Sequence, residues 1–333
     1  DFGVFPQIIL FPDRSFIAFR WDYDPAREVT PSFMASQTET RDDHERVEAA
    51  YLHELTDPRV TGQNTNSAIL WEGASQIDGE PIVVIATGLD TDSKNGKTGA
   101  MVQTWILRQD VAPAEAVNTG KDASICGSCP HMKREYSDGK KVRTCYVNLR
   151  TPSSIWKAYK AGSYAHAGPN VQRTIRASKL RLGSYGDPAA APASMWAGYT
   201  PRLDTDRTGY THQWNATGKL AREMSRDNEW YKRHLMASVD SVEEMLEAQA
   251  QGWRTFLVLP EVTPETSLRL ALSISAASET SIRCPSDASI PEDKRVSCAD
   301  CGACHGNPSF GEKRSVYIGA HGPTKKRIGL PIL

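Results

Sequence analysis

The seven cysteines of this 333-residue chain fall into two tight groups, and no cysteine lies outside them. A set of three and a set of four result: Cys126, Cys129 and Cys145, then Cys284, Cys298, Cys301 and Cys304. Thiolates at C-x2-C spacing bind soft metals, because one short turn lets both sulfurs reach the same ion or cluster. Four thiolates fill a tetrahedral site, whereas three leave one position open for chemistry. The sequence therefore predicts one closed metal site and one reactive site.

The composition is that of a globular protein with a sizeable core. Hydrophobic residues make up 39% and charged residues 24%, which is ordinary for a soluble chain. The formal net charge of −1 gives no general attraction to nucleic acid or to membranes. No apolar run approaches the roughly 18 residues that a membrane helix needs. An odd number of clustered cysteines favours a reducing compartment, so we expect a cytoplasmic protein with no membrane partner.

Residues 1–67 are expected to form an N-terminal extension. Two apolar runs at 4–11 and 16–19 are separated by a proline-containing turn, which predicts a short hairpin. The stretch 22–48 is polar and charged and predicts a linker or an exposed helix start. A short helix is expected over 45–55.

From residue 68 onward, predicted strands and helices begin to alternate. Seven strands are expected from residue 101, at 101–107, 179–184, 209–214, 235–239, 255–259, 281–284 and 315–319. Helices are expected at 153–160, 193–198, 219–224, 242–251 and 267–275. Such alternation is typical of βα units and a parallel sheet. We therefore expect the α/β class, with a full or partial TIM-like (βα) barrel at 68–280 and a cysteine-rich cluster loop within 281–333.

Polar side chains stand at or just after the ends of several predicted strands, where barrels of this kind build their active sites. Asp187, His212 and Asp240 occupy such positions. Carboxylates and imidazoles there can exchange protons with a substrate or bind it. These three residues are the predicted catalytic residues.

Two motifs lie in matching places around the first two predicted barrel strands. The loop after the first strand contains Cys126-Gly-Ser-Cys129-Pro and then Cys145-Tyr146, and the second strand leads into Gly186-Asp187-Pro188. This order resembles the radical S-adenosylmethionine superfamily, in which three cysteines follow the first strand and a Gly-Gly-Glu-Pro-like motif ends the second. The usual spacing there is C-x3-C-x2-C, whereas this chain has C-x2-C-x15-C. The pattern also resembles uncharacterised phage and plasmid proteins.

The resemblance implies an iron–sulfur enzyme with two [4Fe–4S] clusters. The set of three would hold the reactive cluster, and the residues near S-adenosylmethionine would be Tyr146, Gly183, Gly186, Asp187 and Ser238. The set of four, with its C-x2-C-x2-C run, is similar to ferredoxin loops and would hold an auxiliary cluster. Reductive cleavage of S-adenosylmethionine would lead to hydrogen abstraction from an unknown substrate. Electrons would come from a donor such as flavodoxin or ferredoxin.

Zinc is an alternative at both sets, because it takes the same ligands at the same spacings. His131 would then complete the first set. One zinc hypothesis is a barrel base-exchange transferase on nucleic acid, with Asp187 and Asp240 as catalytic residues. Another is a zinc-stabilised nucleic-acid-binding or replication-associated protein without enzymatic activity, whose basic runs at 133–143 and 173–181 would contact phosphates.

Overall fold

The computed structural model divides the chain into two compact units, residues 1–63 and 64–333. The structure describes strands at 7–10, 16–22 and 30–36 of the first unit, and 65–91, 95–217, 220, 222, 224, 228–260, 281–307 and 315–320 of the second. The helices expected at 45–55 and 267–275 lie outside the described residues, as does part of the helix expected at 219–224.

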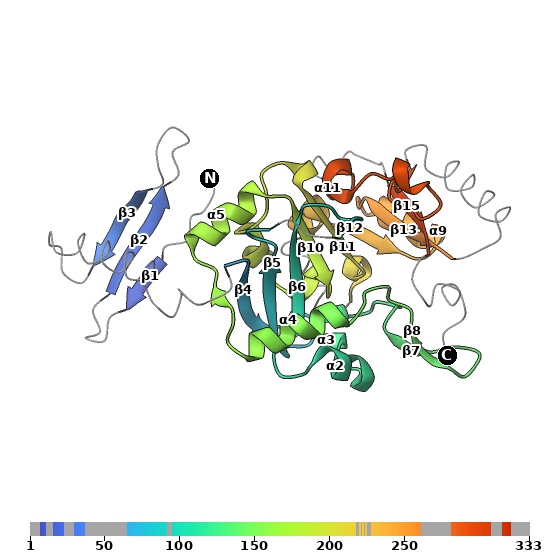
Figure 1. Cartoon of the computed structure of the whole chain (residues 1–333), viewed down its shortest axis with the longest axis horizontal. Helices are drawn as coiled ribbons and strands as arrows, with labels where there is room; N and C mark the ends of the chain where they lie inside the picture. The colour runs from blue at the N-terminus through green and yellow to red at the C-terminus, as the bar shows by residue number, and fades with distance from the viewer. Residues whose placement is uncertain are drawn as a thin grey trace. The chain divides into compact units, whose positions relative to one another are not determined.

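The first unit contains a three-stranded antiparallel sheet, drawn in blue in Figure 1. Its strands are β1 (Gln7–Leu10), β2 (Phe16–Asp22) and β3 (Thr30–Ser36). The β1–β2 pair confirms the expected hairpin. β3 pairs with β2 and corrects the linker expected over 22–48. Its own sequence is a weak strand former, so pairing with β2 decides its conformation.

The second unit is built on a ten-stranded sheet with the order β14-β15-β13-β12-β11-β10-β6-β5-β4-β9 (Figure 1). Its strands are β4 (Ser67–Ala74), β5 (Pro81–Thr87), β6 (Val102–Arg108), β9 (Ala165–His166), β10 (Leu180–Tyr185), β11 (Arg207–Thr211), β12 (Met236–Val239), β13 (Thr255–Leu259), β14 (Ile282–Arg283) and β15 (Val316–Gly319). Every neighbouring pair from β6 to β14 is parallel. On the other side of β6, β5 runs antiparallel to β6, and β4 runs antiparallel to β5.

The seven strands expected from residue 101 onward form this parallel part, which confirms the α/β class. The sheet is not closed, because β14 and β9 are its two ends in the described part of the chain. The full TIM-like barrel is therefore wrong, and the partial barrel is not confirmed. In a closed barrel the last strand would pair with the free edge of the first strand, β6. Here β5 occupies that edge. The strands at 281–319 belong to the same sheet as the rest of the second unit.

The main core lies along β5 and β6 and the elements that cover them. Ile82, Val83, Val84 and Ile85 of β5 are completely buried, so this strand has apolar neighbours on both faces. The helices of the second unit are α2 (Pro113–Thr119), α3 (Ala123–Cys126), α4 (Arg150–Lys160), α5 (Pro169–Ala177), α6 (Ala193–Ala197), α8 (Asn228–His234), α9 (Val242–Ala250) and α11 (Cys298–Cys301). Among the described residues, no helix has both the length and the apolar character needed to cross a membrane.

The last residue of α8 gives the fold a pH dependence. The His234 ring stacks on Trp230 with centroids 4.5 Å apart, and its Nδ1 lies 2.7 Å from the Trp230 carbonyl oxygen. Burial, aided by the charge of Arg207, lowers the pKa of His234 from 6.5 to about 4. The folded state thus excludes a proton that the unfolded chain binds below pH 6.5.

We predict that the free energy of unfolding falls as the pH drops from about 6.5 to about 4, because only the unfolded chain takes up this proton in that window. Urea titrations at several pH values measure the slope. His234→Gln should flatten it. His166→Gln is the control, because the His166 side chain is 71% exposed. An unchanged slope in His234→Gln would contradict the prediction.

Candidate metal centre

All seven cysteines line one cavity of about 340 Å³. Residues of the parallel strands β10 and β11 line the cavity, among them Arg181, Gly183, Tyr185 and Tyr210. The cysteine loops reach it from the carboxyl ends of β6 and β14, the edge at which open α/β sheets bind their ligands.

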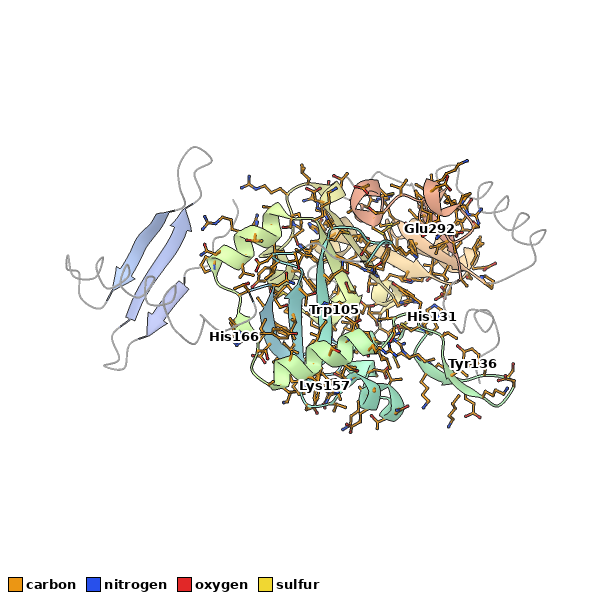
Figure 2. All side chains as sticks on the ribbon, in the orientation of Figure 1. Trp105, His131, Tyr136, Lys157, His166 and Glu292 are labelled. Carbon is orange, nitrogen blue, oxygen red and sulfur yellow. The ribbon has the colours of Figure 1, made fainter. Side chains whose placement is uncertain are left out.

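A hairpin brings the third cysteine of the first set back to the other two. β7 (Lys133–Glu135) and β8 (Lys141–Arg143) pair antiparallel, with Lys133 opposite Arg143. The backbone N–H of Cys145 consequently donates to the His131 carbonyl oxygen at 3.0 Å. Figure 2 labels His131 where the chain enters this hairpin and Tyr136 farther along it. The 15 residues between Cys129 and Cys145 therefore contain a hairpin that returns the chain to the first two cysteines.

Gln213 holds the Cys126 loop from the other side. Its Nε2 donates to the Cys126 carbonyl oxygen at 3.1 Å, and its Oε1 accepts from the Ser128 N–H at 3.3 Å. Gly127 has φ +56°, and a Cβ there would lie 2.3 Å from Gln213 Oε1. The glycine of the C-G-S-C motif is therefore needed so that this amide can pack against the loop.

Asp187 ties the Cys126 loop to the strand ends. Its backbone N–H donates to the Ile125 carbonyl oxygen at 2.6 Å. Its carboxylate accepts from the N–H groups of Ala189 at 3.0 Å and His212 at 2.8 Å. Burial raises the pKa of Asp187, and these N–H groups act in the opposite direction. Asp187 lines the cavity, but much of its hydrogen-bonding capacity is taken up by the backbone.

The second cysteine set is held by backbone contacts from distant segments. The N–H groups of Cys298 and Ala299, at the start of α11, donate to the carbonyl oxygens of Lys97 and Thr98, both at 2.9 Å. The N–H of Cys284 donates to the Tyr317 carbonyl oxygen at 2.8 Å. The loop at 95–98, the helix α11 and the strand β15 thus position these thiols together.

Burial raises the pKa of five of the seven thiols, namely Cys126, Cys145, Cys284, Cys298 and Cys304. The pKa of Cys126 stands well above its ordinary value, through burial and then the neighbouring charge of Cys129. Burial raises the pKa of Cys304 to about 12, against a hydrogen bond with Tyr210. These five thiols therefore hold their protons at neutral pH without a metal, and a metal must displace those protons.

Three cations also line the cavity, namely Lys97, Arg143 and Arg181. Lys97 and Arg181 interact electrostatically with Cys298 of the second set, and Arg143 with Cys126 of the first. Arg143 also donates to the carbonyl oxygens of Cys145 and Val147 at 3.2 and 2.7 Å. These cations can neutralise thiolates that carry a metal.

Sequence reasoning missed these three cations. It placed Arg143 and Arg181 in basic runs for phosphate contact, and it gave Lys97 no role. A signal was available for Arg181, because it lies within the strand expected at 179–184 and not in a loop.

His131, His212 and Asp240 come together beside the first set. His131 Nε2 lies 2.9 Å from Asp240 Oδ1, and His212 Nε2 lies 3.5 Å from Asp240 Oδ2. Burial would raise the pKa of Asp240, but the two histidines outweigh it and hold the pKa well below its usual range. Burial likewise lowers the pKa of His212, but the charges of Cys129 and Asp240 raise it well above its ordinary value.

The alternative in which His131 completes a zinc site is not favoured by this geometry. Its Nε2 faces Asp240, and its Nδ1 lies 3.0 Å from Thr144 Oγ1. Both ring nitrogens therefore have partners other than a metal held by the cysteines.

The remaining predicted site residues lie around the same cavity. Tyr146, Gly183, Gly186 and Ser238 all line it. Tyr146 is 47% exposed, and its hydroxyl accepts from Arg181 at 2.8 Å. Asp240 is not a lining residue, but it contacts two histidines that are.

Comparisons with protein-family models, with curated proteins and with solved structures find no significant match to this chain.

The turn at Gly186 is predicted to be essential for the cavity wall. Gly186 has φ +81°, and a Cβ there would lie 2.7 Å from Ile106 Cβ. Gly139 has a similar φ of +73°, but a Cβ there would meet nothing within 4 Å. Both alanine variants carry the backbone strain of about 1 kcal/mol or more, and only Gly186→Ala adds overpacking of about 1–3 kcal/mol.

Urea unfolding of the two variants measures this difference. Gly186→Ala should lose clearly more free energy of unfolding than Gly139→Ala. Equal losses would mean that the contact with Ile106 does not constrain the turn.

Proposed function

We propose that this chain is an iron–sulfur enzyme resembling radical S-adenosylmethionine enzymes. Cys126, Cys129 and Cys145 would hold the reactive [4Fe–4S] cluster, and the set of four would hold an auxiliary [4Fe–4S] cluster. The observation that carries the proposal is that both sets line one cavity beside the parallel sheet. A redox enzyme could use such an arrangement, in which a reactive thiol set and a closed thiol set face the same cavity.

The thiols are not gathered as closely as four zinc ligands would be. In the described part of the chain, which includes all seven cysteines, no three sulfurs lie within 4.8 Å of one another. Four sulfurs around zinc lie about 3.8 Å apart, given Zn–S bonds of about 2.3 Å. In a four-iron cluster each thiolate binds a different iron, so the sulfurs stand farther apart.

The Tyr185 hydroxyl supports a bound group beside the first set. Tyr185 is 3% exposed and lines the cavity, and its hydroxyl has no hydrogen-bond partner. Buried hydroxyls almost always have a partner. Burial, followed by the charge of Cys126, raises the pKa of Tyr185, so the phenol remains a donor. A cluster sulfur or a ligand at the cluster would accept a hydrogen bond from this hydroxyl.

The chain's own residues would prepare the site as follows. Tyr146, Gly183, Gly186, Asp187 and Ser238 would bind S-adenosylmethionine. When bound, the reduced cluster and S-adenosylmethionine together supply a carbon-centred radical that removes hydrogen from a substrate. Arg143 would neutralise the first thiol set, and the half-buried His212, which lines the cavity, would face the substrate. A one-electron donor such as flavodoxin or ferredoxin would supply the reducing electron.

The two zinc hypotheses have weaker support. A base-exchange transferase needs carboxylates free to act on a nucleotide, whereas Asp187 accepts backbone N–H groups and Asp240 faces two histidines. For a nucleic-acid-binding protein, the basic run at 133–143 is partly used inside the site, because Arg143 holds the Cys145 loop.

Metal analysis tests the proposal. We predict about eight irons and eight sulfides per chain in protein purified without oxygen, with a broad brown absorbance. Replacing the first set by serines should leave about four irons, and replacing the second set should do the same. About two zincs per chain and a colourless sample would contradict the iron–sulfur proposal.

Electron paramagnetic resonance tests the use of S-adenosylmethionine separately. Adding it to reduced protein should change the signal when only the second set has been replaced by serines. It should not change the signal when only the first set has been replaced. A signal unaffected by S-adenosylmethionine in both variants would leave an iron–sulfur protein of another class.

A further inference from the structure

We propose that His131, His212 and Asp240 form a site for one divalent first-row transition metal, separate from the two thiol sets. One ligand atom from each residue lies within 4.8 Å of the other two, and no other such group exists among the described residues. The proposal does not depend on what the cysteines hold.

Three separate elements bring these ligands together. His131 follows the C-G-S-C motif, His212 follows β11, and Asp240 follows β12. Strands β11 and β12 are parallel neighbours, so their carboxyl ends place His212 and Asp240 side by side. Two imidazoles and one carboxylate suit iron(II), cobalt(II) or zinc, and they leave coordination positions open.

The distances suit a metal ion. Ligand atoms at right angles around an ion, with bonds of about 2.1 Å, lie about 3.0 Å apart. Asp240 Oδ1 lies 2.9 Å from His131 Nε2, and Asp240 Oδ2 lies 3.5 Å from His212 Nε2. One ligand atom of each histidine lies within 4.8 Å of the other, so the three side chains would draw together around an ion.

A poorly partnered nitrogen favours a metal over a plain hydrogen-bond network. His212 Nε2 is buried and lies 3.5 Å from Asp240 Oδ2, too far for a well-formed hydrogen bond. A network built for hydrogen bonding would be expected to satisfy this atom. A metal between His212 and Asp240 would satisfy it.

The outer contacts of His131 fit the same role. Its Nδ1 lies 3.0 Å from Thr144 Oγ1, which lies 3.1 Å from the Tyr136 hydroxyl. Metal-bound histidines are usually oriented in this way through the ring nitrogen that does not bind the metal. Because His131 and His212 both line the cavity, open positions on the ion would be accessible to an oxygen or nitrogen ligand in it.

Equilibrium dialysis tests the proposal on the full chain with its thiol sites loaded as purified. After dialysis against micromolar cobalt(II) without oxygen, the wild type should hold about one cobalt per chain with its iron content unchanged. Asp240→Asn and His131→Gln should each weaken cobalt binding at least tenfold. His166→Gln is the matched control, because His166 is an exposed histidine 3.4 Å from a carboxylate, that of Glu72.

The X-ray absorption spectrum of the bound cobalt identifies its ligands even if a variant does not fold. Imidazole scattering without sulfur would support the site. Sulfur ligands, a wild type that takes up no cobalt, or folded variants that bind cobalt as tightly as the wild type would overturn it. Those outcomes would reduce the three residues to a hydrogen-bond network and leave the iron–sulfur proposal unaffected.

Discussion

The buried carboxylate of Asp187 is the interaction on which the site depends. It bridges backbone N–H groups beyond β10 and β11, while its own N–H holds the loop that carries Cys126. A carboxylate out of water is costly unless donors surround it. Here the donors are backbone N–H groups of the segments that follow β10 and β11. Separating these segments would leave the buried carboxylate without donors, so the free-energy cost of its burial keeps them together. Gln213 extends this connection to the Cys126 carbonyl.

Both thiol sets then follow from one topological feature. The sheet runs parallel from β6 to β14, so every loop after these strands opens at the same edge. β15 inserts between β13 and β14, and its Tyr317 carbonyl receives the N–H of Cys284. The two cysteine sets therefore share one cavity with the cations that can neutralise them, although even their nearest members, Cys145 and Cys284, are 139 positions apart in the sequence.

Much of the second unit could be predicted from the sequence because its signals are local. The seven parallel strands, the cysteine sets and the turn at Gly186 each have a pattern within a few residues. Closure of the sheet and the position of β3 depend on pairing between distant segments, which no local pattern reveals. The His131–Asp240 contact is of the same kind, because it joins a cysteine loop to the end of β12. The roles of Arg143 and Arg181 were missed because runs of basic residues usually face solvent.

The central claim is that two iron–sulfur clusters share one cavity. Electron paramagnetic resonance of the fully reduced protein tests it most directly. Two paramagnetic clusters bound in the same cavity must interact magnetically. The account predicts a broadened, coupled spectrum that becomes a simple single-cluster signal when either thiol set is replaced by serines. Two independent signals that merely add, or no iron signal at all, would contradict it.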